Sequence, residues 1–257
     1  MNNVKKGKKM PKFFVNEENI EDEKVTILGE DVNHIKNVLR KNIKDTLEIC
    51  DVQNGKNFLC EIEQIEKEQI ICSIIEKLEN KSESSTYIHI YQGLPKSDKM
   101  ELIIQKSVEL GVAEITPTNM SRCIVKLDSK DARKKVERWQ KISEVAAKQS
   151  GRDIIPKINN ICNFKEITHQ CEEYDAIILA YENEKENKLK NEIAKLKNLQ
   201  KENLKIAIII GPEGGIAKEE VEKAKESGIR VITLGNRILR TETVALNILS
   251  ILMYELE

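Results

Sequence analysis

From residue 87 onward, short runs of branched apolar residues alternate with segments of helical periodicity. The clearest runs are YIHIYQGL (87–94), AIILA (176–180) and KIAIII (205–210). Each is followed by a segment in which apolar residues recur every three or four positions, and the last such segment begins near residue 243. This alternation is typical of a parallel α/β sheet whose strands are connected by helices. We therefore predict an α/β domain over residues 87–257.

The part of the chain before residue 87 has a different pattern. Segments rich in β-branched residues are predicted strands, at 24–28, 46–52, 57–65 and 70–78. A single helical segment is predicted at 31–40. Several strands with one short helix indicate a small β-barrel. The predicted division is a basic extension at 1–11, a barrel at 12–79, a polar linker at 80–86 and the α/β domain.

The bulk composition excludes several classes of protein. The 42 basic and 43 acidic side chains nearly cancel, so nucleic-acid binding would have to come from local patches. The six cysteines form no CxxC pair, which argues against a metal site and a disulfide framework. No apolar run is long enough for a membrane span, and no signal peptide is recognisable. We expect a soluble cytoplasmic protein with no membrane partner and no metal.

The strand at 205–210 leads into a glycine-rich turn, GPEGG. Gly211, Gly214 and Gly215 do not spell GxGxxG, and no GK[ST] follows, so neither common nucleotide fingerprint is present. Glu213 would also repel a phosphate at short range. The glycines still allow a flat, uncharged group such as adenine to approach the backbone closely. The alternative is a tight strand-to-helix connection that carries a surface glutamate.

A second loop of the same kind follows VITLG, where the sequence continues NRILRTETVALNIL. Two predicted parallel strands thus end in loops at their carboxyl ends, where open α/β sheets bind ligands. Thr241 is the predicted N-cap of the last helix, with Glu242 in its first turn. Arg237 and Arg240 precede a helix N-terminus, where cations oppose the helix dipole. We therefore expect the two arginines to serve a ligand.

The last helix is apolar over most of its circumference. Its polar residues form one narrow stripe, made of Thr243, Asn247, Ser250 and Tyr254. A helix of this kind must be buried on most sides. A homodimer would provide the second covering surface, and a larger core within the chain would do the same.

Residues 211–249, from GPEGG through RILRTETVALNIL, resemble the C-terminal signature of the 16S rRNA (uracil(1498)-N3)-methyltransferases. The similarity extends to GLPKSDKMELIIQKSVELGV (93–112), EVAAKQSGRDIIPKI (144–158), MPKFFV (10–15) and HIKNVLR (34–40). The sequence departs from this family at Lys12, where arginine is frequent, and in NIKDTL (42–47), which lacks the glycine expected before Asp45.

The resemblance implies a SPOUT-type C-terminal α/β domain with a parallel sheet tied in a deep trefoil knot, and a small N-terminal PUA-like β-barrel. It implies S-adenosylmethionine as cofactor and 16S ribosomal RNA of the small subunit as partner, with methylation of uridine N3. The cofactor-binding residues that it implies are Leu179, Ala180, Glu182, Ile210, Gly211, Pro212, Glu213, Gly214, Gly215, Leu234, Gly235, Arg237, Ile238, Leu239 and Thr241.

Arg240 matches the arginine of the family's RTET motif, and we expect it to be the catalytic residue. A guanidinium aimed at the uracil oxygens would stabilise the anion that forms when N3 loses its proton. Glu242 is a possible proton acceptor, although its place beside the helix dipole explains it equally well. The candidate RNA-binding residues are Lys12, Arg40, Lys96, Lys99, Gln149 and Arg152.

Three other functions are open to a chain with this sequence. A related knotted methyltransferase could act on another RNA position, such as a ribose 2′-hydroxyl. A non-catalytic RNA-binding or ribosome-assembly factor could retain the fold. An NAD-dependent dehydrogenase would require the GxGxxG motif that is missing here. The RILRTET segment and the N-terminal barrel favour methylation of a base nitrogen.

Overall fold

The computed structural model describes residues 12–52, 54–79 and 82–257. The chain forms two compact units, of which the first contains residues 1–83 and 151–155, and the second contains 84–150 and 156–257. The division falls inside the predicted linker, but residues 151–155 leave the predicted α/β domain and join the first unit. The predicted basic extension at 1–11 lies outside the described residues. No helix within the described ranges is long and apolar enough to cross a membrane.

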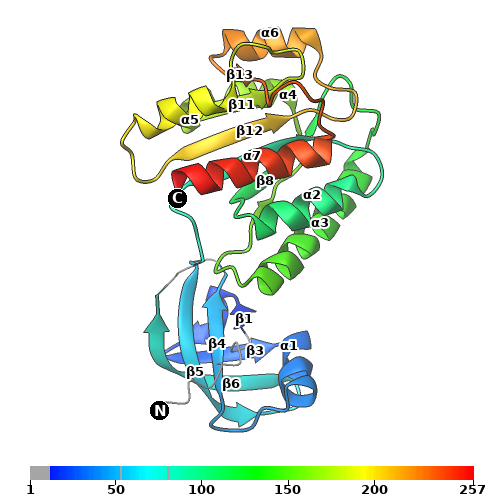
Figure 1. Ribbon diagram of the computed structural model, residues 1–257. Helices are drawn as coiled ribbons and strands as arrows, with labels where there is room; N and C mark the ends of the chain where they lie inside the picture. The colour runs from blue at the N-terminus through cyan, green and yellow to red at the C-terminus, as the bar shows by residue number, and fades with distance from the viewer. Residues whose placement is uncertain (1–11, 53, 80–81) are drawn as a thin grey trace. The chain divides into compact units, whose positions relative to one another are not determined.

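The first unit is built on one six-stranded sheet with the strand order β1-β4-β5-β6-β3-β2 (Figure 1). Only β1 and β4 are parallel, and β1 also contacts β3. Along β3, Val25 and Ile27 are buried while their neighbours are not, which is the two-residue period of a sheet with one covered face. The strands are β1 (Lys12–Val15), β2 (Ile20–Glu21), β3 (Lys24–Leu28), β4 (Thr46–Asp51), β5 (Lys56–Ile65) and β6 (Gln69–Leu78).

The predicted helix at 31–40 is present but irregular. An α-helical turn, α1 (Glu30–Asn33), continues as a π-helical turn, η2 (His34–Val38), and buries Val32 and Ile35 in the core. In the following turn, Lys44 has a φ of +72° and donates its backbone N–H to the Ile62 carbonyl at 2.8 Å. Lys44 therefore adopts the left-handed conformation for which glycine is preferred.

The second unit contains a seven-stranded sheet in which every pairing is parallel, as predicted. The order is β10-β8-β7-β12-β11-β13, and β9 also pairs with β8. The strands are β7 (Tyr87–Gly93), β8 (Glu114–Asn119), β9 (Lys157–Ile158), β10 (Cys162–Asn163), β11 (Ala176–Ala180), β12 (Lys205–Ile210) and β13 (Arg230–Ile232). The helices are α2 (Lys99–Glu109), α3 (Ser129–Ser150), α4 (Phe164–Thr168), α5 (Leu189–Lys197), α6 (Lys218–Glu226) and α7 (Thr241–Leu256).

The last helix, α7, is buried largely by its own chain. It packs against β7 and β12 of the sheet and against α2 and α5, with Ala245, Ile248, Leu249, Leu252 and Met253 buried. The four residues of the predicted polar stripe are all exposed. The core within the chain is thus sufficient to explain most of the apolar circumference of this helix.

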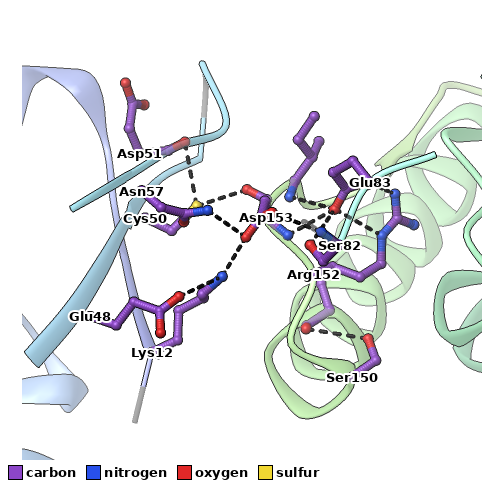
Figure 2. Close-up of polar contacts among 12 residues, drawn as sticks. Lys12, Glu48, Cys50, Asp51, Asn57, Ser82, Glu83, Ser150, Arg152 and Asp153 are labelled. Atoms are coloured by element: carbon purple, nitrogen blue, oxygen red, sulfur yellow. Dashed lines mark hydrogen bonds and ion pairs between the residues drawn. The ribbon is translucent and has the colours of Figure 1, made fainter. Parts of the chain in front are cut away.

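Residues 151–155 follow α3 in sequence, and hydrogen bonds connect them to the other residues of the first unit (Figure 2). The Asp153 carboxylate accepts hydrogen bonds from the ammonium of Lys12 and from Asn57 Nδ2, the latter at 2.6 Å. The backbone N–H of Ser82 also donates to this carboxylate, and Cys50 Sγ lies 2.8 Å from the Asp153 carbonyl. Burial alone would raise the pKa of Asp153, but the hydrogen bonds from Lys12, Ser82 and Asn57 outweigh burial and lower it.

Glu83 makes a second set of contacts to the same segment. Its carboxylate forms an ion pair with the Arg152 guanidinium and accepts the backbone N–H of Asp153 at 2.8 Å and of Ile154 at 3.1 Å. Figure 2 shows the Arg152 side chain turned toward Glu83. Because Arg152 is only 6% exposed, this pair fixes the segment and is not a surface contact.

Replacing Asp153 with alanine should destabilise the first unit by about 3 kcal/mol, because Lys12 and Asn57 lose a buried partner. The folded-state pKa of Asp153 lies below its unfolded value of about 3.9, so the carboxylate stabilises the fold above that pH and loses its effect as the pH falls through the folded pKa. The difference between wild type and variant should therefore shrink below about pH 4.

Urea-dependent amide exchange in β4 and β5 reports the stability of the first unit. Glu68→Ala is the control, because Glu68 is exposed and makes no side-chain contact within the described part of the chain. Equal stability of the Asp153→Ala and Glu68→Ala variants would contradict this account.

Candidate functional site

A cavity of about 750 Å³ lies in the second unit at the carboxyl ends of β11, β12 and β13. Three loops line it, at residues 180–188, 210–216 and 233–241, together with Lys99 and Val244. The carboxyl edge of a parallel sheet is where α/β proteins bind ligands, because the loops that follow neighbouring strands converge there. Both loops that the sequence marked as ligand-binding, GPEGG and NRILRT, belong to this wall.

The glycine turn is closely packed on its neighbours. A Cβ atom at Gly211 would lie 2.7 Å from Ile216 Cγ1, and one at Gly93 would lie 2.7 Å from Pro212 Cδ. At Gly215, where φ is +69°, a Cβ atom would clash with the Glu182 carboxylate. The glycines therefore let the turn pass directly against β7 and against the loop after β11, and side chains there would displace the cavity wall.

Thr241 connects the turn to the last helix. Its hydroxyl donates a hydrogen bond to the Gly211 carbonyl at 2.7 Å and accepts one from Gln92 Nε2 at 2.9 Å. The prediction that Thr241 caps α7 was wrong, because Arg240 occupies the N-cap position and Thr241 is the first helical residue. The threonine side chain therefore connects the start of α7 to the glycine turn and to β7. It does not cap the helix.

The carboxylate of the turn is neutralised by its neighbours. Glu213 accepts the backbone N–H of Lys96 at 3.0 Å and lies 3.1 Å from the Lys99 ammonium, which is also 3.4 Å from Glu242. Burial alone would raise the pKa of Glu213, but hydrogen bonds from its own backbone, from Lys96 and from Lys99 lower it. The hydrogen bond to Glu213 raises the pKa of Lys99. At neutral pH the site thus holds a fixed ammonium between two carboxylates.

The loop after β11 contributes two carboxylates with different surroundings. Glu184 accepts backbone N–H groups of residues 185–187 and lies 3.7 Å from the Lys225 ammonium. Hydrogen bonds from the backbone N–H groups of Glu186 and Asn187 lower the pKa of Glu184. Glu182 makes no hydrogen bond or ion pair with any described residue, and its carboxylate lies against Gly215. Glu182 is therefore the carboxylate that can pair with a cationic ligand in this cavity.

Two arginines in the cavity wall lack a protein partner. Arg237 and Arg240 are exposed, and neither forms a hydrogen bond or ion pair through its guanidinium with residues 12–52, 54–79 or 82–257. Arg240 stands at the N-terminus of α7, where the helix dipole disfavours a cation. Two guanidinium groups in this position are available to oxygen atoms of a ligand.

The structure brings together almost all of the predicted cofactor-binding residues. Each of them lines the cavity except Leu179, whose side chain is fully buried within β11. The catalytic candidate Arg240 lines the same cavity. Eight further lining residues were not predicted, namely Tyr181, Glu184, Lys185, Lys188, Ile216, Thr233, Asn236 and Val244. The first four belong to the run YENEKENK (181–188), whose polar residues directly follow a buried strand.

The predicted RNA-binding residues are divided between the two units, with Lys12, Arg40 and Arg152 in the first and Lys96, Lys99 and Gln149 in the second. Arg40, Lys96 and Gln149 are exposed, and Lys99 belongs to the cavity wall. Lys12 and Arg152 instead form ion pairs with Asp153 and Glu83 inside the first unit. Both side chains are thus occupied by acidic partners of the same chain.

No histidine lies in the described wall of the cavity. His89 is buried within the sheet, where its ring lies 2.6 Å from the Tyr174 hydroxyl and 2.8 Å from Thr116 Oγ1. Burial lowers the pKa of His89 to about 4, so the ring is neutral near pH 7. His34 and His169 are exposed. Imidazole chemistry is therefore not part of the described cavity.

Thr241→Val keeps the shape of the side chain but leaves the Gly211 carbonyl and the Gln92 amide without this partner. We expect the second unit to lose about 2 kcal/mol in the free energy of unfolding. The single tryptophan, Trp139, is buried in α3 of this unit, so urea unfolding followed by its fluorescence measures the change. Thr243→Val, at an exposed position on the same helix, should change stability by less than about 0.5 kcal/mol. Similar losses in both variants would contradict the role of the Thr241 hydroxyl.

Two family comparisons cover most of the chain. Residues 82–253 match the RNA methyltransferase domain family, and residues 27–75 match the RNA methyltransferase PUA domain family. The chain is 39% identical to the ribosomal RNA small subunit methyltransferase E of Bacillus subtilis, over 90% of each chain. It is 35% identical to the protein of the same name from Mesomycoplasma hyopneumoniae, over 94% of this chain and 98% of the relative.

Solved structures agree with these sequence relationships. The fold is similar to the crystal structure of a ribosomal RNA small subunit methyltransferase E from Neisseria gonorrhoeae bound to S-adenosyl methionine, with a TM-score of 0.80 and 32% identity. That similarity covers 95% of this chain and 97% of the other. With its α/β domain, its PUA-like domain and its relatives over nearly the whole length, the chain belongs to the family of ribosomal RNA small subunit methyltransferases E.

Proposed function

We propose that this protein transfers a methyl group from S-adenosylmethionine to N3 of one uridine in 16S ribosomal RNA, the uridine for which the family is named. The observation that carries the proposal is the pair of unpartnered arginines in a glycine-walled cavity that also contains carboxylates. The carboxylates disfavour a phosphate-bearing cofactor, whereas the arginines suit an anionic reaction partner.

The residues of the cavity fit S-adenosylmethionine. The glycine turn admits the flat adenine ring against the backbone, and side chains at Gly211 or Gly215 would fill that space. Glu182 is free to face a positive charge, because no described residue pairs with it. The cofactor supplies the methyl group on its sulfonium centre. The loops at 180–188, 210–216 and 233–241 would hold it and keep water away from that group.

Arg240 would act on the nucleobase. Uracil N3 becomes nucleophilic when it loses its proton, and the charge then spreads onto the two ring oxygens. A guanidinium held at the N-terminus of α7 can donate hydrogen bonds to those oxygens and stabilise the charge as it develops. Glu213 is a poor proton acceptor because its lowered pKa leaves it a weak base. Glu242 forms an ion pair with the Lys99 ammonium at 3.4 Å, so its carboxylate is already engaged by the protein.

The proposed RNA contacts outside the cavity are Arg40, Lys96 and Gln149, which are exposed. Lys99 would help to hold the loop at the cavity entrance through Glu213 and Glu242. We leave Lys12 and Arg152 out of the interface, because each would have to break a buried ion pair before it could bind a phosphate.

The trefoil knot, the homodimer and the cytoplasmic location belong to the same proposal. The turn at 211–215 packs against Gly93 and is linked through Thr241 to α7, so the segments that a knot would have to interlace are in contact. On α7, the exposed stripe of Thr243, Asn247, Ser250 and Tyr254, flanked by the half-buried Leu246 and Ile251, would be the surface for a second copy of the chain. Light scattering coupled to gel filtration measures the subunit number directly.

Arg240→Ala should reduce methyl transfer at least about 100-fold, because one fixed charge-stabilising donor in an active site is worth that much. The substrate for the assay is small ribosomal subunits from a strain that lacks the enzyme, with labelled S-adenosylmethionine as donor. Cofactor affinity, measured by calorimetry, should change less than about threefold, since the residue is proposed to act on the base.

Arg240→Lys is the matched control for charge. It keeps a cation but loses the planar pair of donors, so we expect activity between that of wild type and that of Arg240→Ala. Unchanged turnover in Arg240→Ala would overturn the catalytic assignment. Binding of the cofactor without any transfer by the wild-type protein would overturn the proposed activity on this RNA.

A further inference from the structure

A second cavity, of about 400 Å³, lies in the second unit beyond the carboxyl ends of β8 and β10. These strands are parallel neighbours, and their last residues, Asn119 and Asn163, are directly paired. The cavity is lined by residues of β8 and the loop after it, of β10, and of α4 and α6. None of these residues belongs to the wall of the first cavity.

The lining of the second cavity matches the parts of a nucleotide. Phe164 and Met120 form the apolar floor of the cavity and are themselves almost fully buried, at 5% and 3% exposed. Asn119 and Asn163 are exposed, and each places an amide with both donors and an acceptor at the edge of this surface. Unstacked RNA bases are typically bound between such apolar contacts and amides that read the base edge.

Three lysines from separate elements surround the same cavity. Lys126 follows β8, Lys165 lies on α4 and Lys223 lies on α6, and all three are exposed. None of the three ammonium groups forms an ion pair with a residue in the described part of the chain. Lysines without acidic partners around a nucleobase-sized hollow are suited to the phosphates on either side of one nucleotide.

The one carboxylate among the lining residues is occupied by the protein itself. Glu220 accepts hydrogen bonds from the backbone N–H and the hydroxyl of Ser121, both at 2.9 Å, and from the backbone N–H of Ala217 at 3.2 Å. Glu220 is 8% exposed and its carboxylate oxygens already accept these hydrogen bonds, so it would repel a bound phosphate only weakly. The cavity therefore presents a net positive charge.

The second cavity adjoins the proposed active site through the loop after β8. Arg122 Nη1 donates to the Gly214 carbonyl at 3.1 Å, and its neighbours Ser121 and Cys123 line the second cavity. Helix α6 begins directly after the glycine turn and contributes Lys223 to the second cavity. The two cavities are thus separate, and the Arg122–Gly214 hydrogen bond and the start of α6 connect the segments that line them.

We propose that the second cavity binds a nucleotide of the substrate RNA that flanks the methylated uridine. The inference rests on the proposed function, since it assigns a second contact to the same RNA strand. The phosphates would lie against Lys165 and Lys223, the base would enter the cavity above its buried apolar floor, and Asn119 would contact the base edge.

The test compares two double variants with the same change in charge. Lys165→Glu with Lys223→Glu alters the cavity, whereas Lys190→Glu with Lys218→Glu alters exposed lysines outside it. Binding is measured with 16S ribosomal RNA extracted from a strain that lacks the enzyme, over a series of KCl concentrations. We expect the first pair to weaken binding about tenfold or more, and to flatten the slope of log K against log salt by about 1.5, because two phosphate contacts are lost. The control pair should change affinity less than about threefold.

Asn119→Ala tests the contact to the base separately from the phosphates. It should weaken RNA binding about fivefold without a change in the salt slope, because an amide releases no counterions. Equal affinities of the cavity and control variants, or no effect of Asn119→Ala, would overturn the nucleotide site.

Calorimetry with S-adenosylmethionine and the transfer rate at saturating RNA should stay within about twofold of wild type in all these variants. If wild type binds no cofactor and transfers no methyl group, the proposed function fails. If wild type is active but the cavity variants bind RNA like their controls, only the second site fails.

Discussion

The Thr241 hydroxyl holds together three segments that lie far apart in the chain. It bonds to the Gly211 carbonyl, 30 residues away, and to the Gln92 amide, 149 residues away. All three groups are buried or nearly so, and an unpaired polar group in such a place costs about 1–3 kcal/mol. The position of α7, and with it that of Arg240, therefore depends on the same junction that fixes the glycine turn.

Charge in the proposed active site is divided between groups that the protein neutralises and groups that it leaves free. Lys99 lies between Glu213 and Glu242, so the charges beside the turn are largely compensated. Arg237, Arg240 and Glu182 have no partner in the described part of the chain. An arrangement with free guanidinium groups and one free carboxylate suits a reaction between a cationic donor and an anionic acceptor, because each reactant meets an opposite charge.

Much of the fold could be predicted from the sequence, because the period of its apolar residues is regular. The strands at 24–28, 176–180 and 205–210 are found with the predicted bounds. The short strands β9 and β10 were not predicted, because a strand of two residues is too short to show a periodic pattern of apolar residues. The π-helical turn at 34–38 was also missed, because its apolar spacing is nearly that of an α-helix.

The parts of the site that form a local sequence motif could be predicted. These are the glycine turn and the two arginines before the last helix. The ion pairs of Lys12 and Arg152 could not be predicted from the sequence. Their partners, Asp153 and Glu83, lie 141 and 69 residues away, and no local pattern reveals such a pair. Thr241 was mistaken for a helix cap for the same reason. Its two partners come from distant strands, whereas capping is the commonest local use of threonine at that position.

The most direct test of the account is a nucleoside analysis of the methylated product. Small ribosomal subunits from a strain that lacks the enzyme are incubated with the wild-type protein and labelled S-adenosylmethionine, and their RNA is then digested to nucleosides. The account predicts that the label is recovered in 3-methyluridine alone. Label in a 2′-O-methylated nucleoside, or in any other base, would contradict the assignment of Arg240 to a uracil anion and with it the proposed reaction.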